Sequence, residues 1–321
     1  MPKSSKKIYL APFQGITRQI FRACYAKHFP FVDKIFTPYF AGMSPKSKLA
    51  KKNLAELANI KENNISIIPQ ILSKDSAEII YFAEMIEQFG FNELNWNLGC
   101  PFPQVANKKR GSGLLPYPEI IDNILNQVFK NINIQFSIKC RLGYYADNEI
   151  DKLISIFNNY PIKEIIIHAR TGTQLYGGNV NIEKFCEIQP EFKIPLVYNG
   201  DIFSESDFIA VDKRCKIDTY MIGRGILSNP FLPAIIKNED LPSDMNLKIQ
   251  KFLEELYLAY RKATNDNLST LGSMKEMWKY LSESFAEPQK IMRKIKKVNS
   301  FDEYEDVFAN IIKSELIIGK K

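Results

Sequence analysis

Eight short apolar runs recur along the first 225 residues of the chain. They lie at residues 8–12, 34–40, 66–72, 92–99, 136–143, 164–170, 195–202 and 219–225. In most of them apolar residues follow one another instead of alternating with polar ones, which is typical of strands buried on both faces of a parallel sheet. The pattern therefore predicts eight parallel strands.

The segments between these runs carry helix signals. Residues 73–90 are one example, with Ser73 or Asp75 as the N-cap and Gly90 as the stop. Eight strand–helix units within about 230 residues predict an α/β fold, a (β/α)8 TIM barrel. Because the chemistry of such barrels sits at the carboxyl ends of the strands, polar residues at those ends are the candidates for function.

After about residue 245 the strand signals stop and amphipathic helical patterns replace them. The Pro- and Asp-containing stretch 238–246 reads as a boundary, so we expect a catalytic barrel over 1–240 and an all-helical domain over 241–321. Within 289–298, basic residues fall at helical spacing on one face opposite Ile291, Ile295 and Val298. That basic face consists of Lys290, Arg293, Lys294 and Lys297.

Composition narrows the class of protein. Hydrophobic residues make up 45% and charged residues 25% of the chain, and no apolar run approaches the roughly 20 residues of a membrane helix. The basic start is interrupted by Pro12 too early for a signal peptide. Five scattered cysteines, two histidines and no C-x-x-C favour a cytoplasmic protein without a disulfide framework or a zinc site.

The net charge of +7 is clustered. Beside the basic face of 289–298, basic residues gather at 46–52 and at Lys108, Lys109 and Arg110. Such clusters either keep a protein soluble or bind a polyanion, and the charge alone leaves both readings open.

Polar residues fall at the predicted strand ends. Each has an ordinary structural reading, but together they occupy one rim. "NGDI" (199–202) and "IGRG" (222–225) place glycine backbone and an arginine where barrels bind phosphate. Gln70, Lys139 and His168 offer an amide, a lysine and an imidazole to a flat heterocycle, so a phosphorylated planar cofactor such as FMN fits. A dinucleotide-binding Rossmann site does not fit, because the nearest match to its glycine motif, residues 111–116, lacks the third glycine.

Cys100 lies in "NWNLGCPFPQVANKKRGSGLL" (95–115), directly after a predicted strand. A lone cysteine is usually a packing residue, because free cysteines are among the most buried residue types. Its place on the same rim as the phosphate signals favours a reactive thiol.

Several motifs, in order, resemble those of the tRNA-dihydrouridine synthases. They are "LAPFQGIT", "QIL", "ELNWNLGCP", "KKRGSGLL", "IKCRLG", "HARTGTQLYGG", "YNGDI" and "MIGRG", between residues 10 and 225. Departures are Phe13 where methionine is common, Arg18 where an acidic residue is common and Ala169 where glycine is common. These departures bear on the subfamily more than on the activity.

The resemblance implies an FMN enzyme that NADPH reduces and that converts tRNA uridines to 5,6-dihydrouridine. Cys100 matches the family's active-site acid, which protonates C5 while hydride reaches C6. The implied FMN contacts are Pro12, Phe13, Gln14, Gln70, Lys139, His168, Asn199, Gly200, Asp201, Gly223 and Arg224. The expected substrate contacts are Asn95, Lys108, Lys109, Arg110, Arg141, Arg170, Lys290, Arg293, Lys294 and Lys297.

The substrate uridine has to leave its stack to reach a flavin inside a barrel, and the segment 106–113 is expected to be a mobile loop that closes over it. We expect a monomer that binds tRNA and neither a metal nor a membrane. Two other functions stay open: a flavin reductase of a small dihydropyrimidine or enoate, and a non-catalytic RNA-binding barrel. The basic tail counts against the first, and the presence of Cys100 and Lys139 counts against the second.

Overall fold

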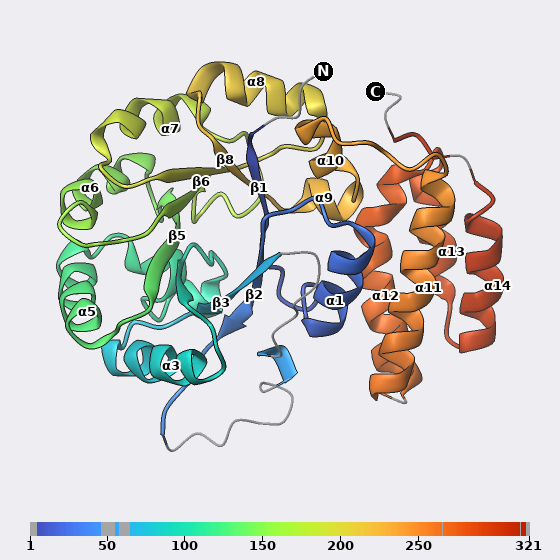
Figure 1. Cartoon of the computed structure of the whole chain (residues 1–321), viewed down its shortest axis with the longest axis horizontal. Coiled ribbons are helices and arrows are strands. Elements are labelled where there is room, and N and C mark those ends of the chain that lie inside the picture. Colours follow the sequence, from blue (N-terminus) through green and yellow to red (C-terminus); the bar gives the residue numbers. More distant parts are fainter. Residues whose placement is uncertain (1–4, 46–54, 58–64, 265, 315, 319–321) are drawn as a thin grey trace.

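The computed structural model describes residues 5–45, 55–57, 65–264, 266–314 and 316–318 (Figure 1). The basic cluster at 46–52 lies wholly outside these ranges, because 46–54 are not described.

Eight parallel strands close into a barrel in the order in which they follow one another along the chain. The strands are β1 (Lys7–Leu10), β2 (Lys34–Phe40), β3 (Ser66–Ile71), β4 (Glu93–Leu98), β5 (Gln135–Gly143), β6 (Ile165–Thr171), β7 (Leu196–Asn199) and β8 (Thr219–Ile222). The prediction of a (β/α)8 barrel is confirmed. The predicted runs extend beyond β7 and β8, and the additional residues form the glycine-containing turns at the rim.

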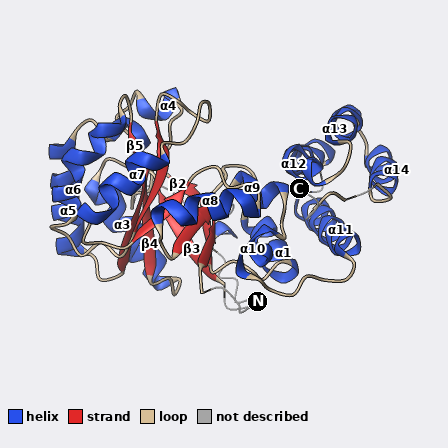
Figure 2. Cartoon of the chain, turned by 90° about the horizontal axis from the view of Figure 1, so that it is seen from above, coloured by secondary structure: helices blue, strands red, loops and turns tan. Residues whose placement is uncertain are grey.

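Helices cover the outside of the barrel (Figures 1 and 2). They are α1 (Gln19–His28), α3 (Ser76–Gln88), α4 (Pro103–Ala106), α5 (Pro118–Asn131), α6 (Asp151–Phe157), α7 (Ile182–Ile188), α8 (Glu205–Cys215), α9 (Arg224–Ser228) and α10 (Leu232–Lys237). Of the two N-caps expected for α3, Asp75 is the one observed. Its side chain accepts a hydrogen bond from the Ala77 N–H. Most of the buried apolar residues lie between the strands and this helical layer.

A smaller apolar cluster fills the barrel interior, because alternate residues of each strand point inward. Its buried members are Tyr9, Ala11, Phe36, Ile68, Ile166, Val197 and Met221. This plug closes the barrel below the polar rim.

Four helices follow the barrel and pack beside it (Figures 1 and 2). They are α11 (Met245–Thr264), α12 (Asn267–Leu281), α13 (Pro288–Lys297) and α14 (Phe301–Ile311). Helix α11 lies on α1, where Phe252 meets the rings of Phe21 and Phe29 edge-on at 6.1 and 5.2 Å. Helix α12 contacts α9, which forms part of the barrel rim. The predicted change from strands to helices is confirmed, and the loop 238–244 separates α10 from α11.

The sequence pattern favours a chain without a disulfide framework, and the structure contains one disulfide that this pattern does not predict. Cys186 on α7 and Cys215 at the end of α8 are bonded, with their Cα atoms 5.2 Å apart. The two cysteines lie 29 positions apart in sequence, and the spacing does not reveal that α7 and α8 are neighbours in the outer layer. Cys24, Cys100 and Cys140 are buried and take no part in a disulfide.

Among the described residues, no helix is both long enough and apolar enough to span a bilayer. The same part of the chain contains no group of three or more histidine, cysteine or carboxylate side chains arranged to hold a metal ion.

Candidate active site

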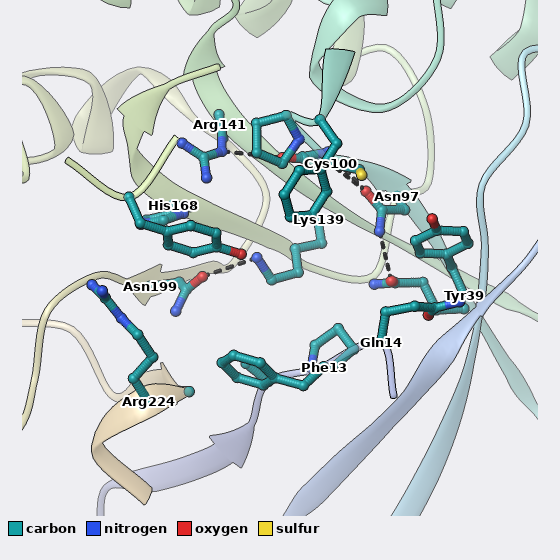
Figure 3. Close-up of a pocket in the computed structure, with 18 of the residues that line it drawn as sticks. Phe13, Gln14, Tyr39, Asn97, Cys100, Lys139, Arg141, His168, Asn199 and Arg224 are labelled. Atoms are coloured by element: carbon teal, nitrogen blue, oxygen red, sulfur yellow. Dashed lines mark hydrogen bonds between the residues drawn. The ribbon is translucent and has the colours of Figure 1, made fainter. Parts of the chain in front are cut away.

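A cavity of about 490 Å³ opens at the carboxyl end of the barrel. Residues at the ends of all eight strands line it, together with Lys279 and Tyr280 from α12 (Figure 3). Four of the lining residues are basic and one is acidic. The predicted strand-end residues that reach it are Pro12, Phe13, Gln14, Gln70, Cys100, Lys139, Arg141, His168, Asn199, Gly200, Asp201, Gly223 and Arg224.

Cys100 is fixed in a tight turn after β4. Asn97 Oδ1 accepts hydrogen bonds from the N–H groups of Gly99 (3.0 Å) and Cys100 (2.9 Å). The Cys100 carbonyl accepts from the N–H (3.0 Å) and the hydroxyl (3.1 Å) of Ser112. Burial raises the pKa of the Cys100 thiol, partly offset by hydrogen bonds and nearby cations, so at neutral pH the sulfur carries a proton that it can donate.

The end of the segment expected to be a mobile loop, residues 111–113, packs against the Cys100 turn and Ala106. Gly111 has φ +56°, and a Cβ there would lie 2.6 Å from the Cys100 carbonyl oxygen. A Cβ at Gly113 would lie 2.3 Å from the Ala106 carbonyl oxygen. Because these glycines have no Cβ, the short helix 111–114 packs directly against the turn that contains Cys100.

The basic residues of this segment follow the Cys100 turn in the chain and do not line the cavity. Lys108 and Lys109 are exposed, and the Lys109 ammonium lies 4.0 Å from the centre of the Tyr117 ring. Arg110 is half-buried. Their position suits contacts with a ligand that extends out of the cavity.

Lys139 points into the cavity from β5. Its ammonium donates to Asn199 Oδ1 (2.9 Å), and Asn199 in turn donates to the Met221 carbonyl (2.8 Å). Burial, and secondly the charge of Arg141, lower the lysine pKa to about 8. The hydrogen-bonding partner of this lysine is a neutral amide, so the site is prepared for an anionic or electron-rich ligand.

His168 lies on the neighbouring strand β6. Burial, followed by the charges of Arg141 and Lys139, lowers its pKa well below the usual value, so the ring is neutral at pH 7. Its Nε2 lies 3.3 Å from Arg170 Nη1, a group that only donates, which assigns the acceptor role to Nε2 and leaves Nδ1–H as a donor.

Asp201 holds two arginines at the rim. Arg170 pairs with it at 2.5 Å and Arg224 at 2.6 Å, and both interactions help to lower the carboxyl pKa against the opposing effect of burial. Arg170 is 1% exposed and also donates to the carbonyls of Gly177 and Gly178, so it fixes the loop after β6 and does not line the cavity. Arg170 thus lies behind the cavity, where it positions Asp201 and the loop after β6.

Arg224 presents a guanidinium to the cavity from the start of α9. It lies 5.2 Å from the ring centres of both Tyr176 and Phe203, which together with Asp201 restrict its position. Arg141 also lines the cavity, and its guanidinium donates to the carbonyls of Gly99 (3.1 Å) and Thr171 (2.6 Å).

Two glycines, Gly200 and Gly223, line the cavity together with Arg224. A Cβ at Gly223 would lie 2.9 Å from the Phe13 ring, and one at Gly200 would lie 2.3 Å from the Tyr198 hydroxyl. Backbone therefore borders the cavity at both positions. This is the kind of surface that approaches a phosphate closely.

Below the cavity, amide side chains join β3, β4 and β5. Gln70 Nε2 donates to Asn95 Oδ1 (2.8 Å), and Asn97 Nδ2 donates to Gln70 Oε1 (2.7 Å). Asn95 is fully buried and does not line the cavity, because its Nδ2 is directed at Ser137 Oγ (2.9 Å) in the barrel interior. The place expected of Asn95 belongs to Asn97, one inward position nearer the rim.

Sequence reasoning missed nine lining residues, among them the side chains of Tyr39, Asn97, Tyr176, Lys279 and Tyr280. "NWN" offered a signal for Asn97, since both asparagines lie on one face of a strand. Tyr280 packs edge-on against Phe13 at 5.8 Å, a contact between helix α12 and the first strand end that no local pattern encodes.

The basic tail residues lie away from the cavity. In α13, Ile291 and Ile295 are buried whereas Lys290, Arg293, Lys294 and Lys297 are exposed. The predicted division of this helix into an apolar and a basic face is confirmed.

Comparison with known proteins places this site in context. The sequence profile of the family described as dihydrouridine synthase matches residues 9–315. The chain is 31% identical over 241 residues to tRNA-dihydrouridine synthase B of Pasteurella multocida, covering 72% of this chain and 69% of the relative. It is 25% identical over 319 residues to the tRNA-dihydrouridine(16) synthase of Neisseria meningitidis serogroup B, covering 96% and 95%.

A solved structure, of a variant of NCR from Zymomonas mobilis, shares the fold with a TM-score of 0.52. It is 15% identical and covers 75% of this chain and 90% of that chain.

Proposed function

The chain belongs to the dihydrouridine synthase family, and from that premise we propose that it reduces uridines of tRNA to 5,6-dihydrouridine, with FMN as cofactor and NADPH as reductant. The observation that carries the proposal is the position of Cys100, a protonated thiol fixed at the rim of a cavity whose other groups suit a flavin.

The residues fit FMN. Lys139 hydrogen-bonds a neutral amide, and His168 has a free N–H, so both can donate to the carbonyl and nitrogen edge of an isoalloxazine ring. Gly200, Gly223 and Arg224 offer open backbone and a guanidinium to a phosphate. The backbone at Pro12, Phe13 and Gln14 borders the remaining side. When bound and reduced, FMN supplies the hydride that adds to C6 of the uracil.

Gln70 and Asp201 support these contacts in our proposal. Both amide ends of Gln70 are already paired within the barrel, so it braces Asn97 below the ligand. The Asp201 carboxylate would repel a phosphate, and its part is to orient Arg224.

Cys100 acts as the general acid for C5. Its raised pKa keeps the proton on sulfur until the base is in place, and the hydrogen bonds from Gly99 and Cys100 to Asn97 fix the direction of the side chain. Arg141, anchored to two carbonyls beside the thiol, neutralises part of the negative charge that develops on the uracil.

The tRNA is proposed to bind over the rim and along the helical tail. Lys108, Lys109 and Arg110 follow the Cys100 turn in the chain, and the basic face of α13 offers four more cations to phosphates. We assign residues 241–321 as the tRNA-binding domain, with residues 1–240 as the catalytic barrel. We place the protein in the cytoplasm, where tRNA is found, as a monomer.

The test is direct reduction of tRNA. Purified holoprotein is incubated with NADPH and unmodified tRNA transcript, and the nucleosides are analysed by mass spectrometry. The expected result is a uridine that gains two hydrogen atoms at a defined position. Oxidation of NADPH by a free dihydropyrimidine or enoate acceptor without any change in tRNA would favour the small-molecule reductase. A colourless protein that binds tRNA would favour the non-catalytic barrel.

A further inference from the structure

Strand β2 contains an irregularity that turns Tyr39 into the cavity. The pairing of β2 with β3 shifts register between Phe36 and Tyr39. Pro38 has no N–H for a ladder bond, and the Gln70 N–H bonds the Thr37 hydroxyl (3.1 Å) in place of a backbone carbonyl. Phe36 faces the barrel interior, so in a regular strand Tyr39, three residues later, would face outward. The bulge redirects its ring to the site.

Tyr39 meets Cys100 there. Its ring packs against the small cluster of Leu72, Cys100 and Val105. Figure 3 shows the Tyr39 ring on the same side of the cavity as Asn97 and Cys100. The Tyr39 hydroxyl and the Phe102 backbone both oppose the effect of burial, which raises the pKa of Cys100. Two polar groups therefore favour the thiolate at the one atom that changes its protonation.

The other groups that face the sulfur come from two strands. Lys139 and Arg141 on β5 contribute positive charge, which favours the thiolate, and Asn97 on β4 is neutral. Burial acts in the opposite direction and is the largest effect on the pKa of Cys100, so the thiol stays protonated. The Tyr39 hydroxyl favours the thiolate, as the cations do, and it alone of these groups combines a direct contact with a removable side-chain donor.

We infer that Tyr39 is a positioning residue for the acid step, whose hydroxyl aims the Cys100 thiol and stabilises the thiolate left after the proton is given up. The inference rests on the proposed function. In that step the S–H bond breaks, the C5–H bond forms with the electron pair of the uracil enolate, and the S–H electron pair stays on sulfur. A hydrogen bond to the charged product of a proton transfer makes the donor a stronger acid.

The test measures the protonation of the Cys100 thiol separately from the rate of tRNA reduction. Holoprotein of the parent, Tyr39→Phe and Tyr280→Phe is treated with iodoacetamide across a pH series, and alkylation of the Cys100 peptide is measured by mass spectrometry. Tyr39→Phe keeps the ring and loses only the donor. Tyr280→Phe is the matched control, since it removes a hydroxyl from the same cavity on a ring that packs against Phe13. FMN content and thermal unfolding verify that each variant is folded.

The expected result is that the pH midpoint of Cys100 alkylation moves upward in Tyr39→Phe only. Single-turnover oxidation of the reduced holoprotein by tRNA is expected to slow about tenfold in the same variant, the scale of one hydrogen bond to a charged group. An unchanged midpoint in folded Tyr39→Phe overturns the inference, whatever happens to the rate. If the parent fails to reduce tRNA, the proposed function fails, whereas the alkylation midpoint still decides whether Tyr39 tunes the thiol.

Discussion

Lys139 is a buried cation whose pKa depends on its surroundings in the cavity. Its ammonium lies in the cavity, where it donates a hydrogen bond to Asn199 and has Arg141 near by. Burial lowers its pKa to about 8. A cation in such a position is costly to the protein alone and becomes favourable when an electron-rich ligand approaches. The lysine thus couples stability to the contents of the cavity.

Lys139→Met gives a pH test of that coupling in the FMN-free protein. Between pH 8 and the ordinary value of 10.5, the unfolded chain holds a proton that the folded chain has lost, so the stability of the parent rises with pH. The variant lacks this contribution. Across this pH window, the free energy of unfolding of the parent, measured with denaturant, should rise by about 1–3 kcal/mol relative to that of the variant. If the free energies of unfolding of parent and variant changed in parallel with pH, the lowered pKa of Lys139 would be contradicted.

Asn95 and Asn97 show what a sequence cannot settle for single residues. Both lie on the inward face of β4, one pair of residues apart, a rise of about 6.6 Å. Which of them reaches the ligand depends on how far each strand projects above the apolar plug. The position of Arg170 outside the cavity has a related reason, because its donors bond loop carbonyls and Asp201, partners that only the folded chain brings together.

At the scale of elements, all eight strands were predictable because a strand buried on both faces leaves a continuous apolar run. Their register was not predictable. Pro38 was visible in the sequence, but the bulge it accompanies, and hence the entry of Tyr39 into the site, arises from pairing with β3. The disulfide between α7 and α8 likewise follows from how helices neighbour one another.

Helix α13 supports a prediction about tRNA binding. Alanine at Lys290, Arg293, Lys294 and Lys297 leaves buried Ile291 and Ile295 in place. If the face binds phosphates, affinity for tRNA should fall about tenfold near physiological salt and the dependence of log K on log salt should become shallower. Filter binding across a salt series measures both.

The matched control removes the same charge from another part of the surface. Lys130 on α5, Lys152 on α6, Lys213 on α8 and Lys193 in the segment before β7 are all exposed. Their replacement by alanine should leave the salt slope close to that of the parent. Equal slopes for the α13 variant and this control would mean that the α13 face is only solvated.

At the scale of the whole molecule, the barrel and the helical tail form the site together. Lys279 and Tyr280 extend from α12 into a cavity otherwise built by strand ends, and the interface of α11 with α1 is a cluster of aromatic rings. The sequence predicted two parts and could not predict this meeting, because it depends on packing between residues more than 200 positions apart. A tRNA held by the tail would thereby be held at a fixed place relative to the cavity.

The central claim is that Cys100 delivers the proton to C5 in a site whose other residues hold the cofactor. Cys100→Ala removes the thiol and leaves the contacts of Lys139, His168 and Arg224 in place. Stopped-flow absorbance of bound flavin measures the two half-reactions separately, first reduction by NADPH and then single-turnover reoxidation by tRNA. The account predicts unchanged FMN content and reduction, with reoxidation slowed roughly 10²- to 10⁴-fold. Reoxidation by tRNA at the parent rate in folded, FMN-loaded Cys100→Ala would contradict it.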